Sequence, residues 1–210
     1  VMGRQNKGVN AAGTITQTVF DVRNLVASTW RGTNDKRATD ADPTGGGAAG
    51  NNMMQISANE YDGGSAGGDG NLTEQTDYVD GSTTRVTAYE YDFRDRRVAT
   101  DGEEDFYEEV EYNNLNQVVR VDRRNTSAVG NLVARAETAF DDRGHVYQDT
   151  RYAVDPATGA VGDGLVSNTW RDASGNMICS LPAGSQAFTK ASFDGINRPT
   201  AQYLGYSPVS

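Results

Sequence analysis

Apolar and polar side chains alternate along several short stretches of the chain, which is the pattern of β-strands. From Thr14 to Phe20, the residues Thr14, Thr16, Thr18 and Phe20 fall on one face, and the residues between them fall on the other. Leu25 to Arg31 has the composition of an antiparallel partner for that strand. No stretch repeats its apolar residues with the 3.6-residue period of a helix. The pattern therefore predicts an all-β fold.

The clearest strand–turn–strand pattern runs from Phe140 to Tyr152, with the sequence FDDRGHVYQDTRY. Gly144 can adopt a positive φ at no steric cost, and the short carboxylate of Asp141 can accept hydrogen bonds from the amides of the turn. A type I turn that ends in a left-handed residue is a common way to close a β-hairpin. This stretch therefore predicts a hairpin.

The same order of residues recurs: an aromatic residue, then Asp or Asn, then Gly, Asn or Asp three positions later. Those last three residue types tolerate the left-handed region best. The regular copies consist of Phe20, Asp21 and Asn24; Tyr91, Asp92 and Asp95; Tyr112, Asn113 and Asn116; Phe140, Asp141 and Gly144; and Phe193, Asp194 and Asn197. The recurrence predicts consecutive antiparallel hairpins that form a curved repeat sheet.

Two further copies are less regular. After Tyr61, a Gly-rich insert from Gly63 to Gly70 delays the end of the turn. At Trp170, an arginine stands where the acid is expected and Gly175 comes one residue late, which predicts a turn longer by one residue. The steps between the copies are unequal, and this favours hairpins joined by variable loops over a rigid solenoid.

The recurring pattern resembles the YD repeats of rearrangement-hotspot (Rhs) proteins, and the resemblance covers residues 1–210. In that family the repeats form a β-sheet that spirals into a hollow shell, often around a toxic cargo, and in some members they serve contact at the cell surface. The resemblance implies a structural, non-catalytic segment of a larger extracellular or cell-surface protein. Its expected partners are the remainder of its parent chain or an enclosed cargo domain.

Composition fits a thin sheet better than a thick core, because apolar residues make up 36% of the chain and the mean hydropathy is -0.65. The net charge of -10 and the scattered bases argue against a nucleic-acid partner. No apolar run is long enough to span a bilayer, and the first residues contain no apolar targeting signal, so membrane insertion is not expected.

The β-pattern stops at about residues 32–52, which we predict to be a flexible insert. Within it, Asp40, Asp42 and Thr44 with Gly45 match the opening of a calcium loop. The twelfth position holds Asn51 in place of the bidentate Glu, so a solvated linker is the favoured interpretation.

The densest part of the chain pairs aromatic strands with an acidic run. Tyr89 and Tyr91 share one face of a strand, and Phe106, Val110 and Tyr112 share a face of the strand after the next turn. If those strands are neighbours, their aromatic side chains can form a cross-strand ladder.

The acidic run includes Glu103 and Glu104 and raises the possibility of paired catalytic carboxylates. A solvated acidic edge is the favoured interpretation, because nothing in the sequence marks one acid as buried and another as solvated.

Enzyme signatures are missing, so we expect no catalytic, cofactor or metal site. Cys179 is the sole cysteine and is expected to pack as a small apolar residue in a strand. His145 is the sole histidine and has no motif that would make it a catalytic base or metal ligand. The alternative function is a carbohydrate-binding or adhesive module, in which Trp30 and Trp170 would stack on surface glycans.

Overall fold

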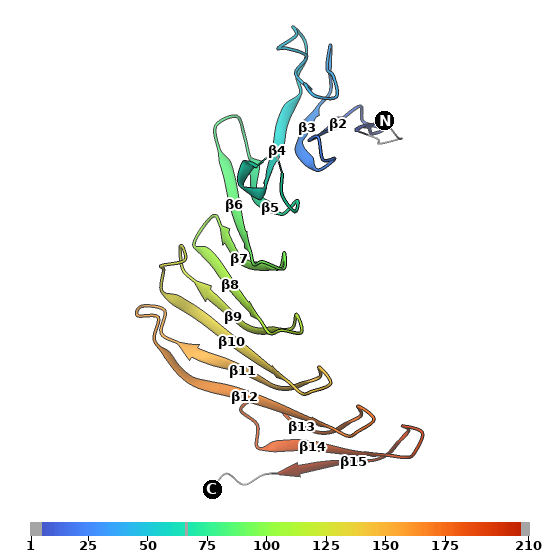
Figure 1. The fold of residues 1–210 in the computed structure, drawn as a ribbon, viewed down its shortest axis with the longest axis vertical. Coiled ribbons are helices and arrows are strands. Elements are labelled where there is room, and N and C mark those ends of the chain that lie inside the picture. The colour runs from blue at the N-terminus through green and yellow to red at the C-terminus, as the bar shows by residue number, and fades with distance from the viewer. Residues whose placement is uncertain (1–5, 66, 207–210) are drawn as a thin grey trace. The chain divides into compact units, whose positions relative to one another are not determined.

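The structure, a computed structural model, describes residues 6–65 and 67–206, and it divides into two units, Val1–Glu103 and Glu104–Ser210. Both units consist of antiparallel strands in sequence order (Figure 1). The strands of the first unit are β1 (Lys7–Val9), β2 (Ile15–Phe20), β3 (Val26–Gly32), β4 (Met54–Tyr61), β5 (Leu72–Tyr78), β6 (Thr84–Tyr91) and β7 (Arg97–Gly102), with a short 3-10 turn η1 (Asp62–Gly64) after β4.

The second unit continues the same plan. Its strands are β8 (Phe106–Tyr112), β9 (Val118–Arg124), β10 (Leu132–Phe140), β11 (Val146–Val154), β12 (Val161–Arg171), β13 (Met177–Leu181), β14 (Ala187–Phe193) and β15 (Pro199–Tyr206). Within each unit, every strand pairs antiparallel with the strand that follows it in sequence. The predicted all-β fold of consecutive antiparallel hairpins is confirmed.

A register shift marks each hairpin that carries the repeated turn. In β10 and β11, Ala139 pairs with Gln148, whereas the next residue, Phe140, pairs with Val146. The aromatic residues of the other regular copies stand at the same kind of shift, for example Phe20 opposite Val26. Such a shift is a β-bulge, which increases the local twist where the chain turns.

Few side chains are buried, as expected for single-layer units. Among residues 6–65 and 67–206, the buried apolar residues are Ile15, Met53, Ala99, Tyr107 and Leu132. Because both faces of a single sheet can reach solvent, polar residues such as Thr and Glu are tolerated on either face. This arrangement accounts for the low mean hydropathy of -0.65.

The predicted insert at residues 32–52 contains no strand after Gly32, the last residue of β3. Hydrogen bonds attach it to the first strands: the side-chain Nε2 of Gln17 donates to the carbonyl oxygen of Thr39 at 2.6 Å. At the end of the insert, the side-chain oxygen of Asn52 accepts from the amides of Thr33 at 2.9 Å and Asn34 at 2.7 Å. The two ends of the segment are therefore held together, while its flexibility stays a prediction.

The predicted ladder between the aromatic residues of β6 and β8 does not form. Strand β6 pairs with β5 and β7, so Tyr89 lies opposite Thr100 and Tyr91 lies opposite Arg97. The two tyrosines do share a face, and the guanidinium of Arg97 lies 5.5 Å from the centroid of the Tyr89 ring. Both edges of β6 are therefore occupied by strands of its own unit, and the sequence pattern did not identify β7 as one of them.

Candidate functional site

The repeated turn is closed by the residue that follows the aromatic. In the copy at Phe140, the Asp141 carboxylate accepts hydrogen bonds from the amides of Arg143 at 2.9 Å and His145 at 2.8 Å. The Asp141 amide donates to the His145 carbonyl oxygen and the Gly144 amide donates to the Asp141 carbonyl oxygen, both at 2.9 Å. Gly144 has a φ of 83°. The carboxylate and the left-handed residue together satisfy the amides of the turn.

The other regular copies have the same geometry. In each of them the side-chain oxygen of the Asp or Asn accepts from the amides two and four residues later. The residue three positions after it has a φ between 58° and 70°. The residues with this left-handed conformation are Asn24, Asp95, Asn116 and Asn197.

The electrostatics of the turns follow from these hydrogen bonds. The side chain of Arg96 donates to Asp92 at 2.8 Å and lowers the pKa of that carboxyl to about 2. The backbone amide of His145 lowers the pKa of Asp141, and the amide of Arg198 lowers that of Asp194. Each of these turns is therefore built around an ionised carboxylate at neutral pH.

The copy at Trp170 has the same turn length as the others, so the predicted extra residue is wrong. Asp172 is the turn acid: it accepts from the amides of Ser174 and Asn176, both at 2.9 Å. Gly175, three residues after it, has a φ of 88°. Arg171 therefore occupies the position that an aromatic residue holds elsewhere, and the register shift falls between Trp170 and Arg171.

The copy at Tyr61 keeps its acid but closes over a longer loop. The Asp62 carboxylate accepts from the amides of Gly70 at 3.1 Å and Asn71 at 3.0 Å. Gly70 is left-handed, with a φ of 83°. The Gly-rich insert separates Asp62 from its left-handed residue, which stands three positions after the acid in the regular copies.

A row of charged side chains crosses one face of the second unit and was not predicted. The carboxylate of Asp122, only 2% exposed, accepts from Nε of Arg135 at 2.7 Å and from its Nη2 at 2.6 Å. Arg120 lies 3.5 Å from Asp122 and 3.0 Å from Glu111. The bond to Asp122 raises the pKa of Arg135. The alternation of Arg120, Val121 and Asp122 was the sequence signal for a charged face.

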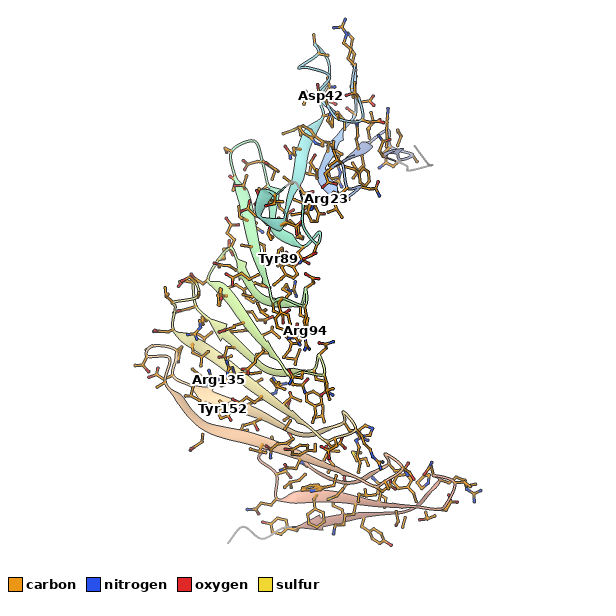
Figure 2. All side chains as sticks on the ribbon, in the orientation of Figure 1. Arg23, Asp42, Tyr89, Arg94, Arg135 and Tyr152 are labelled. Carbon is orange, nitrogen blue, oxygen red and sulfur yellow. The ribbon has the colours of Figure 1, made fainter. Side chains whose placement is uncertain are left out.

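The same face continues onto the next strand. The hydroxyl of Tyr152 donates to Glu137 at 2.8 Å, which raises the pKa of Tyr152. Arg135 and Tyr152 are register partners on β10 and β11, and both are labelled in Figure 2. These bonds join neighbouring strands, so the row stabilises one register of the sheet. Ion pairs of this kind are better evidence of a specified register than of chemistry.

An aromatic hollow of 740 Å³ lies on the same unit. Trp170, Cys179, Lys190 and Tyr203 line it, and they are successive register partners on β12 to β15. Direct partners share one face of a sheet. Trp170 is 46% exposed, whereas Trp30, in the first unit, is half-buried and donates its indole hydrogen to Ser28 at 2.9 Å.

The carboxylate weighed for metal binding is engaged within its own loop. The Asp42 carboxylate accepts from the Thr44 hydroxyl at 2.6 Å and the Gly46 amide at 2.7 Å, so it stabilises the conformation of its own loop. The bond from the Thr44 hydroxyl lowers the pKa of Asp42. Across residues 6–65 and 67–206 there is no group of three or more His, Cys, Asp or Glu side chains that could hold a metal ion. In the same ranges, no helix is long and apolar enough to cross a membrane.

The residues weighed for catalysis are a histidine in a repeated turn, two adjacent glutamates after β7 and a cysteine in β13. Nδ1 of His145 lies 3.2 Å from the Asp141 carboxylate, so the sole histidine supports the repeated turn. Glu103 lies 3.7 Å from Arg85, in an exposed pair. Glu104 stands in the turn after β7 with a φ of 62°, and Cys179 lies in β13. These residues form no shared constellation within either unit.

Comparison with known proteins shows the fold. The structure of the Photorhabdus luminescens Tc holotoxin pore with a TccC3 mutation matches 92% of this chain at 12% identity and a TM-score of 0.54. The crystal structure of TcdB2-TccC3-Cdc42 matches 95% of this chain at 10% identity and a TM-score of 0.37. This chain spans 11% and 12% of the lengths of those two chains. In sequence, it matches no family model and no curated protein.

Proposed function

We propose that the chain is a structural, non-catalytic repeat segment of a larger protein of the Rhs/YD type. The observation that carries this proposal is the recurrence of one turn geometry, with its acid and its left-handed residue, along the chain. The likeness in fold to a chain of the Tc holotoxin pore supports it. In this proposal the sheet is part of an enclosing or surface-displayed β-shell.

The single-layer sheet supports a segment of a shell more than a compact globular domain. A single layer buries few side chains, so its stability depends on contacts between neighbouring hairpins. The proposed partners are accordingly the remainder of the parent chain or an enclosed cargo domain, and the proposed location is extracellular or at the cell surface.

The two faces of β13 offer a test. Cys179 and Ser180 are neighbours in β13, so their side chains point to opposite faces, and both are half-buried. In the complete parent protein, a maleimide reagent should label one face quickly and the other slowly. The two probes are native Cys179 and a Ser180→Cys variant in a Cys179→Ser background.

In the isolated segment, both positions should react at similar rates. Equal labelling of the two positions in the complete protein would show that neither face is enclosed, and the enclosing role would be refuted. The surface-displayed form without enclosure would then be the remaining version of the proposal.

The aromatic hollow supports a second candidate, a carbohydrate-binding or adhesive module. Its partly exposed Trp170 could stack on a sugar ring, and Tyr203 provides another aromatic surface. A glycan-array signal that disappears with Trp170→Ala and persists with Trp30→Ala would support this candidate. No signal from the unmodified chain would remove it.

A further inference from the structure

The aromatic hollow on β12 to β15 continues past Lys190 into a second hollow of 230 Å³. The four strands are the last of the second unit and are drawn in orange and red in Figure 1. Trp170, Cys179 and Lys190 line both hollows. From this shared row, the first hollow extends toward Phe193 and the second toward Phe188, at opposite ends of β14. Together they form one groove along β14, about 17 Å long at roughly 3.3 Å per residue.

Aromatic rings provide much of the surface of this groove. The side chain of Trp170 is 46% exposed and that of Tyr203 is 61% exposed. The Phe188 ring lies against β15 at Gly205, where a Cβ would overlap the ring. The glycine therefore leaves space for the ring to lie close to the sheet. The apolar face of a ligand can stack on such rings, which offer a large contact area at a low cost in conformational entropy.

Lys190 places one positive charge between the two hollows. Its Nζ lies 5.5 Å from the centroid of the Phe188 ring, and it forms no ion pair with any of residues 6–65 and 67–206. An ammonium group has three donors and forms its strongest hydrogen bonds with ionised acceptors such as carboxylates. The groove is therefore suited to a ligand that carries an acidic group.

Asp172 lines the first hollow and requires a different group on the ligand. Its carboxylate accepts from the amides of Ser174 and Asn176 and from Nδ2 of Asn176, all at 2.9 Å. The Asn176 side chain lowers the pKa of Asp172, so this carboxylate is ionised at neutral pH. An ionised carboxylate has about four acceptor sites and no donor, so it can accept one further hydrogen bond from a hydroxyl. It would repel a second acid.

These features favour a sugar over a peptide or a fatty acid. A fatty acid has an acidic group but no hydroxyls for Asp172. A peptide that binds a sheet usually adds its backbone to an open strand edge. Here β13 pairs with β12 and β14, and β14 pairs with β13 and β15, so both edges of these strands are occupied.

We propose that the groove binds an acidic oligosaccharide. The apolar faces of its sugar rings stack on Trp170 and Tyr203, a carboxylate on one ring pairs with Lys190, and a hydroxyl donates to Asp172. The groove is longer than a single six-membered ring, so the ligand has more than one sugar unit. This inference rests on the carbohydrate-binding candidate described above and adds the class of sugar.

The test compares two oligosaccharides that differ only in charge: the tetramer of β-1,4-linked glucose and the same tetramer with each C6 oxidised to a carboxylate. Binding to the full chain with Trp30→Phe is followed by the fluorescence of Trp170, the tryptophan that remains. Salt at about 0.1 M screens the more distant acids of the chain. Under that condition the acidic tetramer should bind about tenfold more tightly, the effect of one hydrogen bond to a charged group.

Three variants assign the preference to the groove. Lys190→Gln should remove the preference for the acidic tetramer and leave the affinity for the neutral tetramer unchanged. Lys36→Gln is the matched control, because it removes the same charge from an exposed position in the first unit, and it should keep the preference. Tyr203→Ala should weaken both tetramers by a similar factor, because stacking does not depend on the acid. Thermal unfolding of each variant checks that the fold is intact.

Four results would overturn the proposal. Equal affinities for the two tetramers would refute the acidic class and leave the carbohydrate-binding candidate standing, whereas no binding of either tetramer would remove both. A preference that persists in Lys190→Gln, or that disappears equally in Lys36→Gln, would show that Lys190 does not select the acid. Displacement of the acidic tetramer by an equal concentration of tetraglutamate would identify an acidic peptide as the ligand.

Discussion

Replacing Gly144 with alanine tests both the turn and its contact with the preceding turn. Gly144 has a φ of 83°, a conformation that costs an L-residue about 1–2 kcal/mol. The added Cβ would also lie 2.9 Å from Nε2 of Gln117, which donates to the Gly144 carbonyl oxygen at 3.1 Å. Displacing Gln117 would therefore remove a hydrogen bond with a net value of about 1 kcal/mol.

The two effects together predict a loss of about 2–3 kcal/mol in the free energy of unfolding. For a chain of this length, that corresponds to a fall in Tm of about 5–10 °C. Thermal unfolding followed by circular dichroism at fixed protein concentration measures it.

Gly195→Ala is the matched control, because Gly195 also lies in a repeated turn but has open space around it and no left-handed φ. Its Tm should change by no more than about 2 °C, the usual range for a compatible glycine position. The double variant Gly144→Ala/Gln117→Ala should be destabilised less than the sum of the single variants, because the close contact is gone. Equal Tm values for Gly144→Ala and Gly195→Ala would refute the reasoning.

Other predictions concern charge and secondary structure. Asp122→Ala should lower the free energy of unfolding, measured by urea titration, by about 2–3 kcal/mol, because it leaves half-buried Arg135 without its carboxylate. The control Arg151→Ala, at an exposed ion pair, should lower it by less than about 0.5 kcal/mol. Similar losses in the two variants would contradict this prediction. Since Arg96 lowers the folded pKa of Asp92 to about 2, below the ordinary 3.8, Asp92 adds stability above that ordinary value and loses it as pH falls toward 2. The fall of Tm between pH 5 and pH 2 should therefore be shallower in Asp92→Asn; an unchanged slope would count against it. Far-ultraviolet circular dichroism should show strand and almost no helix, and a helical spectrum would contradict the fold.

The turn-to-turn contacts were not predictable from the sequence. Nothing in the order of residues shows that Gln117 reaches Gly144, because the contact depends on two hairpins lying side by side. The same is true of Asp122 and Arg135, whose two hydrogen bonds require the register of β9 and β10. The prediction of an aromatic ladder between β6 and β8 was wrong for a related reason. The sequence did not reveal that β7 pairs with β6, whose other edge pairs with β5.

The sequence by itself determined the fold class and the chemistry of the turns. An acid and a left-handed residue three positions later interact within a segment of five residues, so their geometry depends on local sterics and local hydrogen bonds. Even there, the shift from Trp170 to Arg171 at the start of one turn needed the strand register. Only the tertiary structure decided which strands are neighbours and which side chains meet, because those contacts join residues far apart in the chain and depend on how every intervening hairpin packs.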